Sequence, residues 1–329
     1  MTDTVRWGIL GTGRIARDFA EALQATPGAI LAAVASRTQG AADAFADDFG
    51  IPVRLGSYAA LAASPDVDLV YIGTPHALHA DNALAMLEGG KGVLCEKPFA
   101  LNRTQAEPTI ALARSRGLFL MEAMWSRFLP GLQEARRLIA SGALGSVSQA
   151  SADFGFVATS GPEGRLFNPA LGGGALLDIG IYPLSLTSWL LGPVETVQAQ
   201  AELGPTGVDV QTVFTLRHAG GALSTCACSL KARTPGVLTV SGTRGHLRLD
   251  APFHRPPTLT LTNDEGTRII DTPYLGNGYV HEAIEAQRCW QAGLVESPEM
   301  THEQTLQLMG VLDTIRGQIG VRYPGDANP

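Results

Sequence analysis

Short apolar runs alternate with longer amphipathic stretches through the first third of the chain. The runs are rich in Val, Ile, Leu and Ala, which is typical of strands buried on both faces of a parallel sheet. They lie at 7–10, 30–35, 67–72, 91–95 and 119–121, and the helical patterns between them lie at 14–25, 41–49, 57–62, 78–88 and 102–116. This alternation predicts an α/β domain with a doubly wound parallel sheet over residues 1–122.

The pattern changes after Met121, and residues 123–329 read as a second domain of the α+β class. Its strand-like runs are separated by turn residues and continue to residue 270 with no helical pattern between the later ones. This predicts a mostly antiparallel sheet. The helical patterns lie at 132–139, 175–191, 280–292 and 301–319, and the longest strand pattern lies at 147–156.

A Gly-x-Gly-x-x-Ala motif joins the first apolar run to the first helical pattern. Gly11 allows a tight turn, Gly13 lets a pyrophosphate approach the backbone, and Ala16 is small enough for helix and strand to pack closely. The helix N-terminus then offers unpaired N–H groups to the phosphates. We therefore expect a Rossmann dinucleotide site. The expected cofactor contacts here are Gly11, Thr12, Gly13, Arg14 and Ile15. The alternative is a tight strand–helix turn without a ligand.

The second apolar run ends in Ser36-Arg37-Thr38, where enzymes that use NAD usually carry an acidic residue for the ribose 2′-hydroxyl. An arginine beside two hydroxyls suits a 2′-phosphate instead, because it donates charge-assisted hydrogen bonds. The motif therefore favours NADP over NAD, with Ser36, Arg37 and Thr38 as contacts. The alternative is that Arg37 is a solvated loop cation.

Composition and charge limit the classes of protein that fit the chain. Of its 329 residues 45% are hydrophobic and 17% are charged, which supports a large core, and the formal net charge is −7. Neither a nucleic acid nor an anionic membrane surface is favoured as a partner. No apolar run is expected to reach the roughly 18 residues that span a bilayer, and no signal sequence is recognised, so we expect a cytoplasmic protein. The cysteines, expected to be reduced and buried, are Cys95, Cys226, Cys228 and Cys289.

Polar residues follow two further apolar runs. Thr74, Pro75, His76 and His79 follow one of them, and Glu96 and Lys97 follow the next. Because the carboxyl ends of parallel strands meet at one edge of the sheet, we expect these residues at the same crevice as the glycine motif. Lys97 is a candidate for catalysis, since desolvation tunes a lysine's pKa, and the alternative is a solvent-facing lysine paired with Glu96. The two histidines lack partners at metal-ligand spacing, so we expect no metal and place both beside the nicotinamide.

Asp178 and Tyr182 are four residues apart at the start of an apolar helix, so both are expected on one face. The Gly172–Gly174 run before them lets a ligand or another backbone come close. A phenol beside a lysine ammonium ionises more easily, so Tyr182 is a candidate general base, while Asp178 orients the substrate or takes the proton itself. The alternatives are an aspartate stabilised by the helix dipole and a core tyrosine. Trp125 and Phe154 are pocket walls or core residues, and the sequence alone favours core.

Four motifs occur in an order that resembles one known family. They are Gly11–Ala16, Thr74-Pro75-His76-x-x-His79, Val93-Leu94-Cys95-Glu96-Lys97-Pro98 and Gly172-Gly173-Gly174-x-x-x-Asp178-x-Gly180-x-Tyr182. Over nearly its whole length the chain resembles the glucose–fructose oxidoreductase/inositol dehydrogenase (Gfo/Idh/MocA) family. Met121–Phe128, Tyr182 and Gly278–Ala283 resemble its branch of trans-dihydrodiol dehydrogenase and NADP-dependent D-xylose dehydrogenase. Many family members carry histidine where this chain has Tyr182, which argues against inositol-type substrates.

The resemblance implies a role for each candidate residue. Lys97 is implied as the catalytic lysine, Tyr182 as the acid/base residue and Asp178 as a supporting carboxylate. Trp125 and Phe154 are implied as aromatic walls of the substrate pocket. The family also implies a second domain with an open-faced sheet, whose exposed face builds a homodimer or homotetramer.

The implied reaction is NADP-dependent hydride transfer from a secondary hydroxyl of a small cyclic polyol. The first expectation is an aldose, such as xylose or glucose, oxidised at C1, and the alternative is a vicinal diol, as in trans-dihydrodiol dehydrogenase. The family also implies a cis peptide bond before Pro98. From a different functional class, an NAD(P)-binding regulator without turnover stays open. The presence of Lys97, Asp178 and Tyr182 weighs against it.

Overall fold

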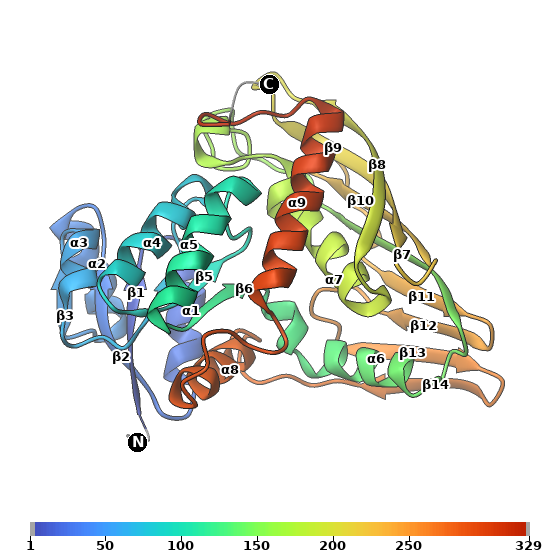
Figure 1. Ribbon diagram of the computed structural model, residues 1–329, viewed down its shortest axis with the longest axis horizontal. Helices are drawn as coiled ribbons and strands as arrows, with labels where there is room; N and C mark the ends of the chain where they lie inside the picture. The colour runs from blue at the N-terminus through green and yellow to red at the C-terminus, as the bar shows by residue number, and fades with distance from the viewer. Residues whose placement is uncertain (1–3, 327–329) are drawn as a thin grey trace. The chain divides into compact units, whose positions relative to one another are not determined.

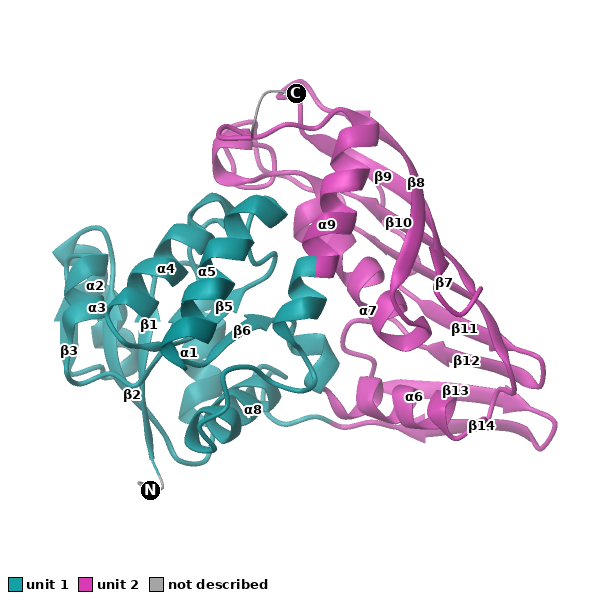
Figure 2. Ribbon diagram, viewed as in Figure 1, with its two compact units in different colours: residues 1–128, 274–306 teal, residues 129–273, 307–329 magenta. Residues whose placement is uncertain are grey.

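The computed structural model describes residues 4–326 (Figure 1). Contacts divide them into two compact units (Figure 2). Unit 1 joins the chain up to Phe128 to Tyr274–Leu306, and unit 2 joins Leu129–Pro273 to the chain from Gln307 onward. The sequence predicts a single boundary after residue 122. The division by contacts differs from it, because a late segment of the chain packs in unit 1.

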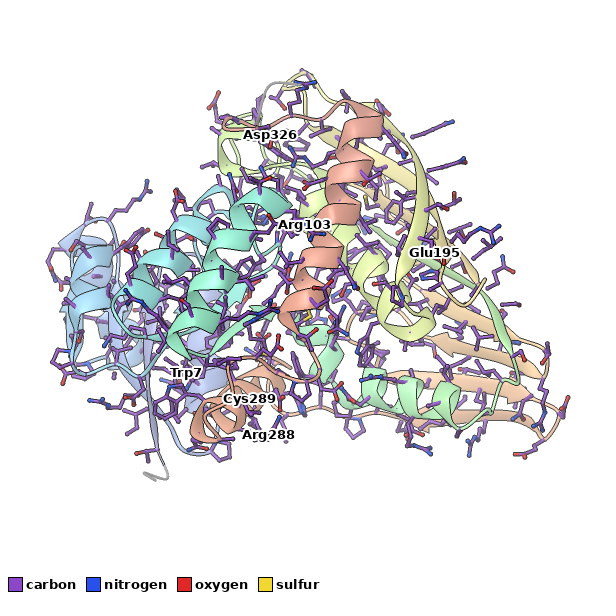
Figure 3. The ribbon with its side chains drawn as sticks, viewed as in Figure 1. Trp7, Arg103, Glu195, Arg288, Cys289 and Asp326 are labelled. Atoms are coloured by element: carbon purple, nitrogen blue, oxygen red, sulfur yellow. The ribbon has the colours of Figure 1, made fainter. Side chains whose placement is uncertain are left out.

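The late segment of unit 1 contains helix α8 (Val280–Gln291). The indole Nε1 of Trp7, a residue of strand β1 labelled in Figure 3, donates to Gln287 Oε1 at 3.0 Å in the buried interior. The side-chain Nδ2 of Asn277 donates to the Asp18 carbonyl at 2.7 Å. These contacts join residues far apart in sequence, so hydrophobic periodicity, which is local, carries no signal for them.

Unit 1 is built on a six-stranded sheet in the order β3-β2-β1-β4-β5-β6. All neighbouring strands are parallel, and the order is that of a doubly wound dinucleotide-binding fold. The strands are β1 (Val5–Leu10), β2 (Ala29–Ala35), β3 (Val53–Leu55), β4 (Leu69–Ile72), β5 (Gly92–Glu96) and β6 (Leu120–Ala123). The predicted parallel sheet is confirmed, with the addition of the short strand β3.

Three helices of unit 1, α2 (Gln39–Phe49), α3 (Tyr58–Ala63) and α5 (Arg103–Arg116), begin at polar caps that the sequence carries. Thr38, Ser57 and Asn102 each accept a hydrogen bond from the backbone N–H three residues later, which satisfies a donor that the first turn leaves unpaired. The unit also contains α1 (Arg14–Gln24), α4 (His79–Glu88) and α8, with short 3₁₀ turns at η1 (His76–Leu78) and η2 (Trp125–Phe128). Helix α9 (His302–Ile319) begins in unit 1 and ends in unit 2.

Unit 2 contains an eight-stranded sheet in the order β14-β13-β12-β11-β7-β10-β9-β8. Every neighbouring pair is antiparallel except β7 and β10, so the predicted mostly antiparallel sheet is confirmed. The strands are β7 (Val147–Gly155), β8 (Val194–Leu203), β9 (Asp209–His218), β10 (Leu223–Ser229), β11 (Leu238–Gly242), β12 (Gly245–Leu249), β13 (Thr258–Asn263) and β14 (Gly266–Asp271).

Helices cover one face of the unit 2 sheet. Figure 1 shows α6 (Pro130–Ala140) and α7 (Ile181–Leu191) along the same face. Side chains on β9 alternate between buried and exposed, as one covered face and one solvent face require. The opposite face carries exposed apolar residues, including Val213 (56% exposed), Leu223 (49%) and Ile269 (70%).

The core of unit 2 includes the apolar stretch Pro169–Leu191. Its π-helical turn η4 (Leu176–Gly180) leads directly into α7. The stretch has 23 residues and a mean hydropathy of 1.3, so by length and composition it is able to cross a membrane. By length and composition alone, the expectation that no apolar run is long enough is therefore wrong, because the stretch counts the glycine run at 172–174 and the short turn before it together with the helix. Within it, 89% of the apolar window is buried, which is the setting of a core helix.

Candidate active site

The turn after β1 has a backbone that only glycine adopts without strain. Gly11 has φ of +103°, and a Cβ there would lie 3.0 Å from the Gly73 carbonyl oxygen. Gly13 is the N-cap of α1, and it caps the helix without a side-chain hydrogen bond. The first N–H groups of α1 are therefore available to an anion. This cradle, which side chains would fill, fits the pyrophosphate of a dinucleotide.

The ends of β1 and β2 bring the predicted ribose contacts together. Thr12 Oγ1 lies 3.4 Å from Ser36 Oγ, and Thr38 is the N-cap of α2. Arg37 is exposed between them. Burial raises the pKa of Tyr58, and the nearby Arg37 charge opposes that shift. Tyr58 is thus a neighbour of the expected 2′-phosphate site that the sequence reasoning missed.

His79 ties together the loops that follow β4 and β5. Its Nδ1 lies 2.8 Å from the Pro98 carbonyl and its Nε2 lies 2.8 Å from the Thr74 carbonyl. Burial lowers the pKa of His79, so its neutral form donates to one carbonyl at a time. Its ring centroid is 5.7 Å from that of His76. The structure thus places His79 in the support of the cofactor loops.

Lys97 lies at the end of β5, half-buried, and is followed by a cis bond to Pro98, as predicted. The adjacent Glu96 is buried: its Oε1 accepts from the Tyr71 hydroxyl at 2.6 Å and its Oε2 accepts from the Lys97 backbone N–H at 3.2 Å. Glu96 therefore fixes the backbone from which the Lys97 side chain extends. Because β1, β4 and β5 are neighbours in the sheet, Gly11, Thr74 and Lys97 stand at adjacent strand ends.

Two further buried carboxyl groups belong to unit 1. Glu122 accepts from the Phe99 N–H at 3.0 Å and from the Thr305 hydroxyl at 2.9 Å, and burial raises its pKa to about 7. Glu282 is fully buried, and burial, together with the Glu96 charge, raises its pKa well above its usual range. The sequence reasoning missed both, although each stands among apolar residues.

An aromatic pair in unit 1 involves one predicted pocket wall. The Trp125 and Tyr279 ring centroids are 4.4 Å apart at an interplanar angle of 32°. Trp125 is buried in η2, and Tyr279 directly precedes α8. The Gly278–Ala283 motif thus supplies the partner of the Met121–Phe128 motif.

A second aromatic group in unit 2 joins Phe154, Tyr182 and His254, and we call it the aromatic triad. The Phe154 ring lies 5.6 Å from Tyr182 and stacks on His254 at 4.6 Å and 11°. The Tyr182 and His254 rings are 5.2 Å apart. The triad joins β7, the start of α7 and the loop after β12. The sequence reasoning missed His254, which stands in an irregular loop and belongs to none of the motifs.

Asp178 forms an ion pair that the sequence reasoning also missed. Arg165 Nη1 donates to Asp178 Oδ1 at 2.7 Å, with 49% of the Arg165 side chain exposed and 9% of the Asp178 side chain. Near the start of the same helical stretch, Asp209 Oδ2 accepts from the Leu176 N–H at 2.8 Å and from the Thr212 hydroxyl at 2.7 Å. Asp209 therefore anchors the turn that carries Asp178.

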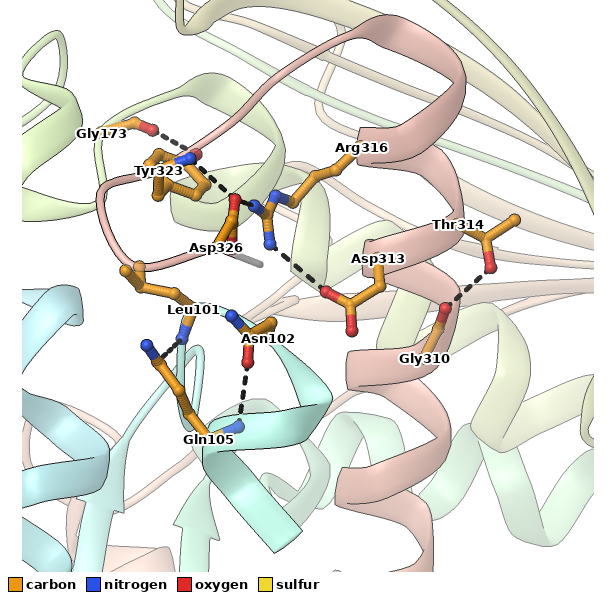
Figure 4. Close-up of polar contacts among 10 residues, drawn as sticks. All are labelled: Leu101, Asn102, Gln105, Gly173, Gly310, Asp313, Thr314, Arg316, Tyr323 and Asp326. Carbon is orange, nitrogen blue, oxygen red and sulfur yellow. Dashed lines mark hydrogen bonds and ion pairs between the residues drawn. The ribbon is translucent and has the colours of Figure 1, made fainter. Parts of the chain in front are cut away.

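The C-terminal segment holds the glycine run that precedes Asp178 (Figure 4). The Tyr323 hydroxyl donates to the Gly173 carbonyl at 2.5 Å, and the Arg316 guanidinium lies 4.6 Å from the centre of the Tyr323 ring. Asp326 accepts from Arg316 and, at 2.8 Å, from the Tyr323 N–H. Gly174 has φ of +121°. The C-terminal segment therefore holds the glycine run from one side, and Asp209 holds the turn that follows the run.

The predicted site residues fall into two groups by unit. Unit 1 contains the expected cofactor contacts and also Lys97 and Trp125. Unit 2 contains Phe154, Asp178 and Tyr182. Among residues 4–326 no three His, Cys, Asp or Glu side chains are grouped as a metal site requires. All four cysteines are buried thiols outside any disulfide, as predicted.

Two family models match the chain. Residues 5–124 match the model described as "Oxidoreductase family, NAD-binding Rossmann fold", and residues 132–248 match the GFO/IDH/MocA C-terminal domain. Together they span most of the chain.

Named relatives and solved structures extend this similarity to almost the full length. Trans-1,2-dihydrobenzene-1,2-diol dehydrogenase of Danio rerio is 38% identical over 98% of this chain and 99% of its own, and that of Mus musculus is 36% identical over the same shares. An aldose-aldose oxidoreductase from Caulobacter crescentus, complexed with glycerol, superposes with a TM-score of 0.87 at 27% identity, over 96% of this chain and 97% of that one. A 3-ketoreductase from Actinomadura kijaniata in complex with NADP and TDP-benzene gives 0.86 at 29% identity, over 96% and 98%.

Proposed function

Because the chain belongs to the GFO/IDH/MocA oxidoreductase family and has its NAD(P)-binding Rossmann domain, we propose that it is an NADP-dependent dehydrogenase of small ring-bearing alcohols. The observation that carries the proposal is the placement of Lys97 at a strand end next to those of the glycine turn and Thr74. Ligands of doubly wound sheets lie beyond these strand ends. A lysine there stands where a bound dinucleotide presents its reactive end.

The preference for NADP rests on Arg37. No acidic residue occupies the Ser36-Arg37-Thr38 segment. Arg37 is exposed between two hydroxyl residues of the chain, and the Ser36 hydroxyl lies 3.4 Å from that of Thr12. A 2′-phosphate fits this set because arginine and hydroxyl groups both donate to it. The NADP named in the Actinomadura kijaniata structure is consistent with this preference.

In the proposed reaction Tyr182 accepts the proton of the substrate, and Lys97 stabilises the ionised form of Tyr182. The bound nicotinamide supplies the hydride acceptor. We propose that the phenol of Tyr182 takes the proton of the substrate hydroxyl, and that the role of the Lys97 ammonium is to favour the ionised phenol. Asp178 accepts a hydrogen bond from a neighbouring substrate hydroxyl. Trp125 and Phe154 supply apolar surface for the ring of the substrate.

Two substrate classes fit the proposal. A cyclic aldose such as xylose or glucose presents its C1 hydroxyl beside a second hydroxyl, and this is the class that the family resemblance implies first. A trans-dihydrodiol presents the same pair of hydroxyls on a flat, unsaturated ring. The aromatic triad favours this second candidate, because stacked rings bind flat apolar faces. The names of the Danio rerio and Mus musculus relatives point the same way.

A panel assay tests the proposal. Purified protein is incubated with NADP or NAD and with xylose, glucose and a trans-dihydrodiol, and NADPH formation is followed by absorbance. We expect turnover with at least one ring-bearing diol or aldose and a lower KM for NADP than for NAD. Tight NADP binding without turnover of any substrate would support the regulator instead.

We also propose that the protein is cytoplasmic and assembles as a homodimer or homotetramer. Support comes from the uncovered face of the unit 2 sheet, where apolar residues on β9, β10 and β14 are about half or more exposed. A partner subunit would remove this apolar surface from water.

A further inference from the structure

The ion pair between Arg165 and Asp178 joins a half-exposed cation to a nearly buried carboxylate. A pair with both partners exposed contributes little, because water screens it. Asp178 differs, since only 9% of its side chain is exposed and an uncompensated charge there is costly. The Arg165 guanidinium therefore places a compensating charge directly against this carboxylate.

The loop that presents Arg165 is held in one conformation on both sides of that residue. The Phe167 N–H donates to the Gly164 carbonyl at 2.9 Å and the Gly174 N–H donates to the Leu166 carbonyl at 2.8 Å. Leu166 and Phe167 pack against the buried cluster of Ala175, Ile179, Cys228 and Leu230. A Cβ at Gly173 would lie 2.9 Å from the Arg165 carbonyl, so the two backbone segments are in close contact. The loop thus holds the backbone of Arg165 where its guanidinium contacts Asp178.

The other titratable groups near this helical turn have their own partners. Asp209 of β9 is bonded to Leu176 and Thr212, and Asp153 of β7 accepts from the Gly236 N–H at 2.8 Å. Burial raises the pKa of the Cys228 thiol of β10 well above its usual range, so it is uncharged. Tyr182 of α7 belongs to the aromatic triad. Arg165, by contrast, is bonded directly to the Asp178 carboxylate.

We infer that Arg165 is a positioning residue, which keeps Asp178 ionised and aimed as an acceptor for a substrate hydroxyl and leaves proton removal to Tyr182. The inference rests on the proposed function, because it assigns roles in that reaction. An aspartate paired with a guanidinium holds its negative charge and takes up a proton less readily. Asp178 is thereby suited to orienting a diol or sugar and poorly suited to act as the base.

The test compares Arg165→Met, which removes the charge, with Arg165→Lys, which keeps it. In Arg165→Met the buried Asp178 takes up a proton at higher pH than in the wild type, so kcat/KM should fall about tenfold on going to mildly acidic pH, mainly through KM. Arg165→Lys should restore most of the wild-type profile. The matched control Arg244→Met breaks the exposed Arg244–Asp264 pair of the same unit and should leave the profile unchanged. An Arg165→Met profile parallel to that of the wild type would overturn the inference.

A second measurement does not depend on turnover. Carbon NMR of protein labelled at aspartate, with Asp178→Asn for assignment, follows the protonation of Asp178 directly. We expect the titration midpoint of Asp178 to be higher in Arg165→Met than in the wild type, even if no substrate of the panel is oxidised. In that case the proposed function fails and the ion-pair role stands. An unmoved midpoint overturns the role of Arg165 whatever the activity shows.

Discussion

Arg37 is the residue on which the proposed cofactor preference depends. It stands where β2 ends, beside hydroxyl groups and near Tyr58. A single side chain has this influence because the 2′-phosphate is the feature that separates the two dinucleotides. An arginine attracts it, and an aspartate would repel it while accepting from a 2′-hydroxyl.

We predict that Arg37→Asp weakens NADP binding much more than NAD binding. Losing a hydrogen bond to a charged group costs about 1.5–3 kcal/mol, or roughly 10- to 150-fold in Kd. Titrating the wild type and Arg37→Asp with NADP and with NAD measures the four Kd values. Arg103→Asp, which removes an exposed arginine of α5, serves as the control. An unchanged ratio of the two Kd values would mean that Arg37 is a solvated loop cation.

Glu122 is expected to make stability depend on pH. Its pKa is about 7 in the folded protein against 4.5 in the unfolded chain. As pH rises from about 4.5 to about 7, the unfolded chain releases this proton first, so the free energy of unfolding falls and then levels off, by an amount on the order of 3 kcal/mol. Glu122→Gln cannot titrate, and its amide still matches Phe99 and Thr305. Urea unfolding of both proteins at about pH 5 and about pH 8 checks this. If the two proteins differ in free energy of unfolding by the same amount at both pH values, Glu122 is not the source of the pH dependence.

The glycine run and the helical stretch after it form the element that carries Asp178 and Tyr182. Tyr323, Asp209 and the positive φ of Gly174 together determine where this element begins. The element is therefore set by residues from β9 and from the C-terminus.

Gly174→Ala should destabilise the protein and disturb this element. Its Cβ would lie 2.4 Å from Asp209 Oδ1, and φ of +121° is strained for any residue with a Cβ. We expect a loss of about 1–3 kcal/mol in the free energy of unfolding. Gly161→Ala in the same loop is the control, because its Cβ would meet nothing within 4 Å. Equal urea midpoints for the two variants would show that the turn relaxes freely.

Elements with a strong local pattern were predictable, and those made by distant contacts were not. The helical pattern predicted at 301–319 begins with Thr301 and Gln304, which exchange both hydrogen bonds of a capping box, at 3.2 and 3.1 Å. Strand β3 has only three residues, too few for a periodic signal. The parallel pairing of β7 with β10 depends on chain topology and leaves no mark in either strand.

Among candidate site residues, motifs identified Lys97 and Tyr182. Arg165 and His254 stand in irregular loops that no periodicity describes.

At the scale of the molecule, the chain returns to its first unit late in the sequence. Helix α8 packs in unit 1, with Gln287 bonded to Trp7 and to the Pro27 carbonyl. A boundary drawn from alternating patterns misses this return, because both units contain amphipathic helices. The exposed face of the unit 2 sheet is the other feature at this scale.

We predict a dimer or larger assembly in sedimentation at micromolar concentration. Val213→Lys places a charge on the exposed sheet face and should shift the protein toward monomer. Val157→Lys is the matched control: Val157 is 51% exposed and follows β7 outside the sheet. A wild type that sediments as a monomer would exclude assembly through this face.

The turnover of Tyr182→Phe shows whether Tyr182 removes the substrate proton, as we propose. The variant keeps the ring and its packing in the aromatic triad but loses the hydroxyl. We predict that kcat falls about 10²–10⁴-fold while the Kd for NADP stays unchanged. We expect a comparable fall in kcat for Lys97→Met and little further loss in the double variant, because the proposed reaction gives the two groups one joint role. If Tyr182→Phe keeps most of its activity while Asp178→Asn abolishes it, the base is Asp178, and Tyr182 is a wall of the pocket.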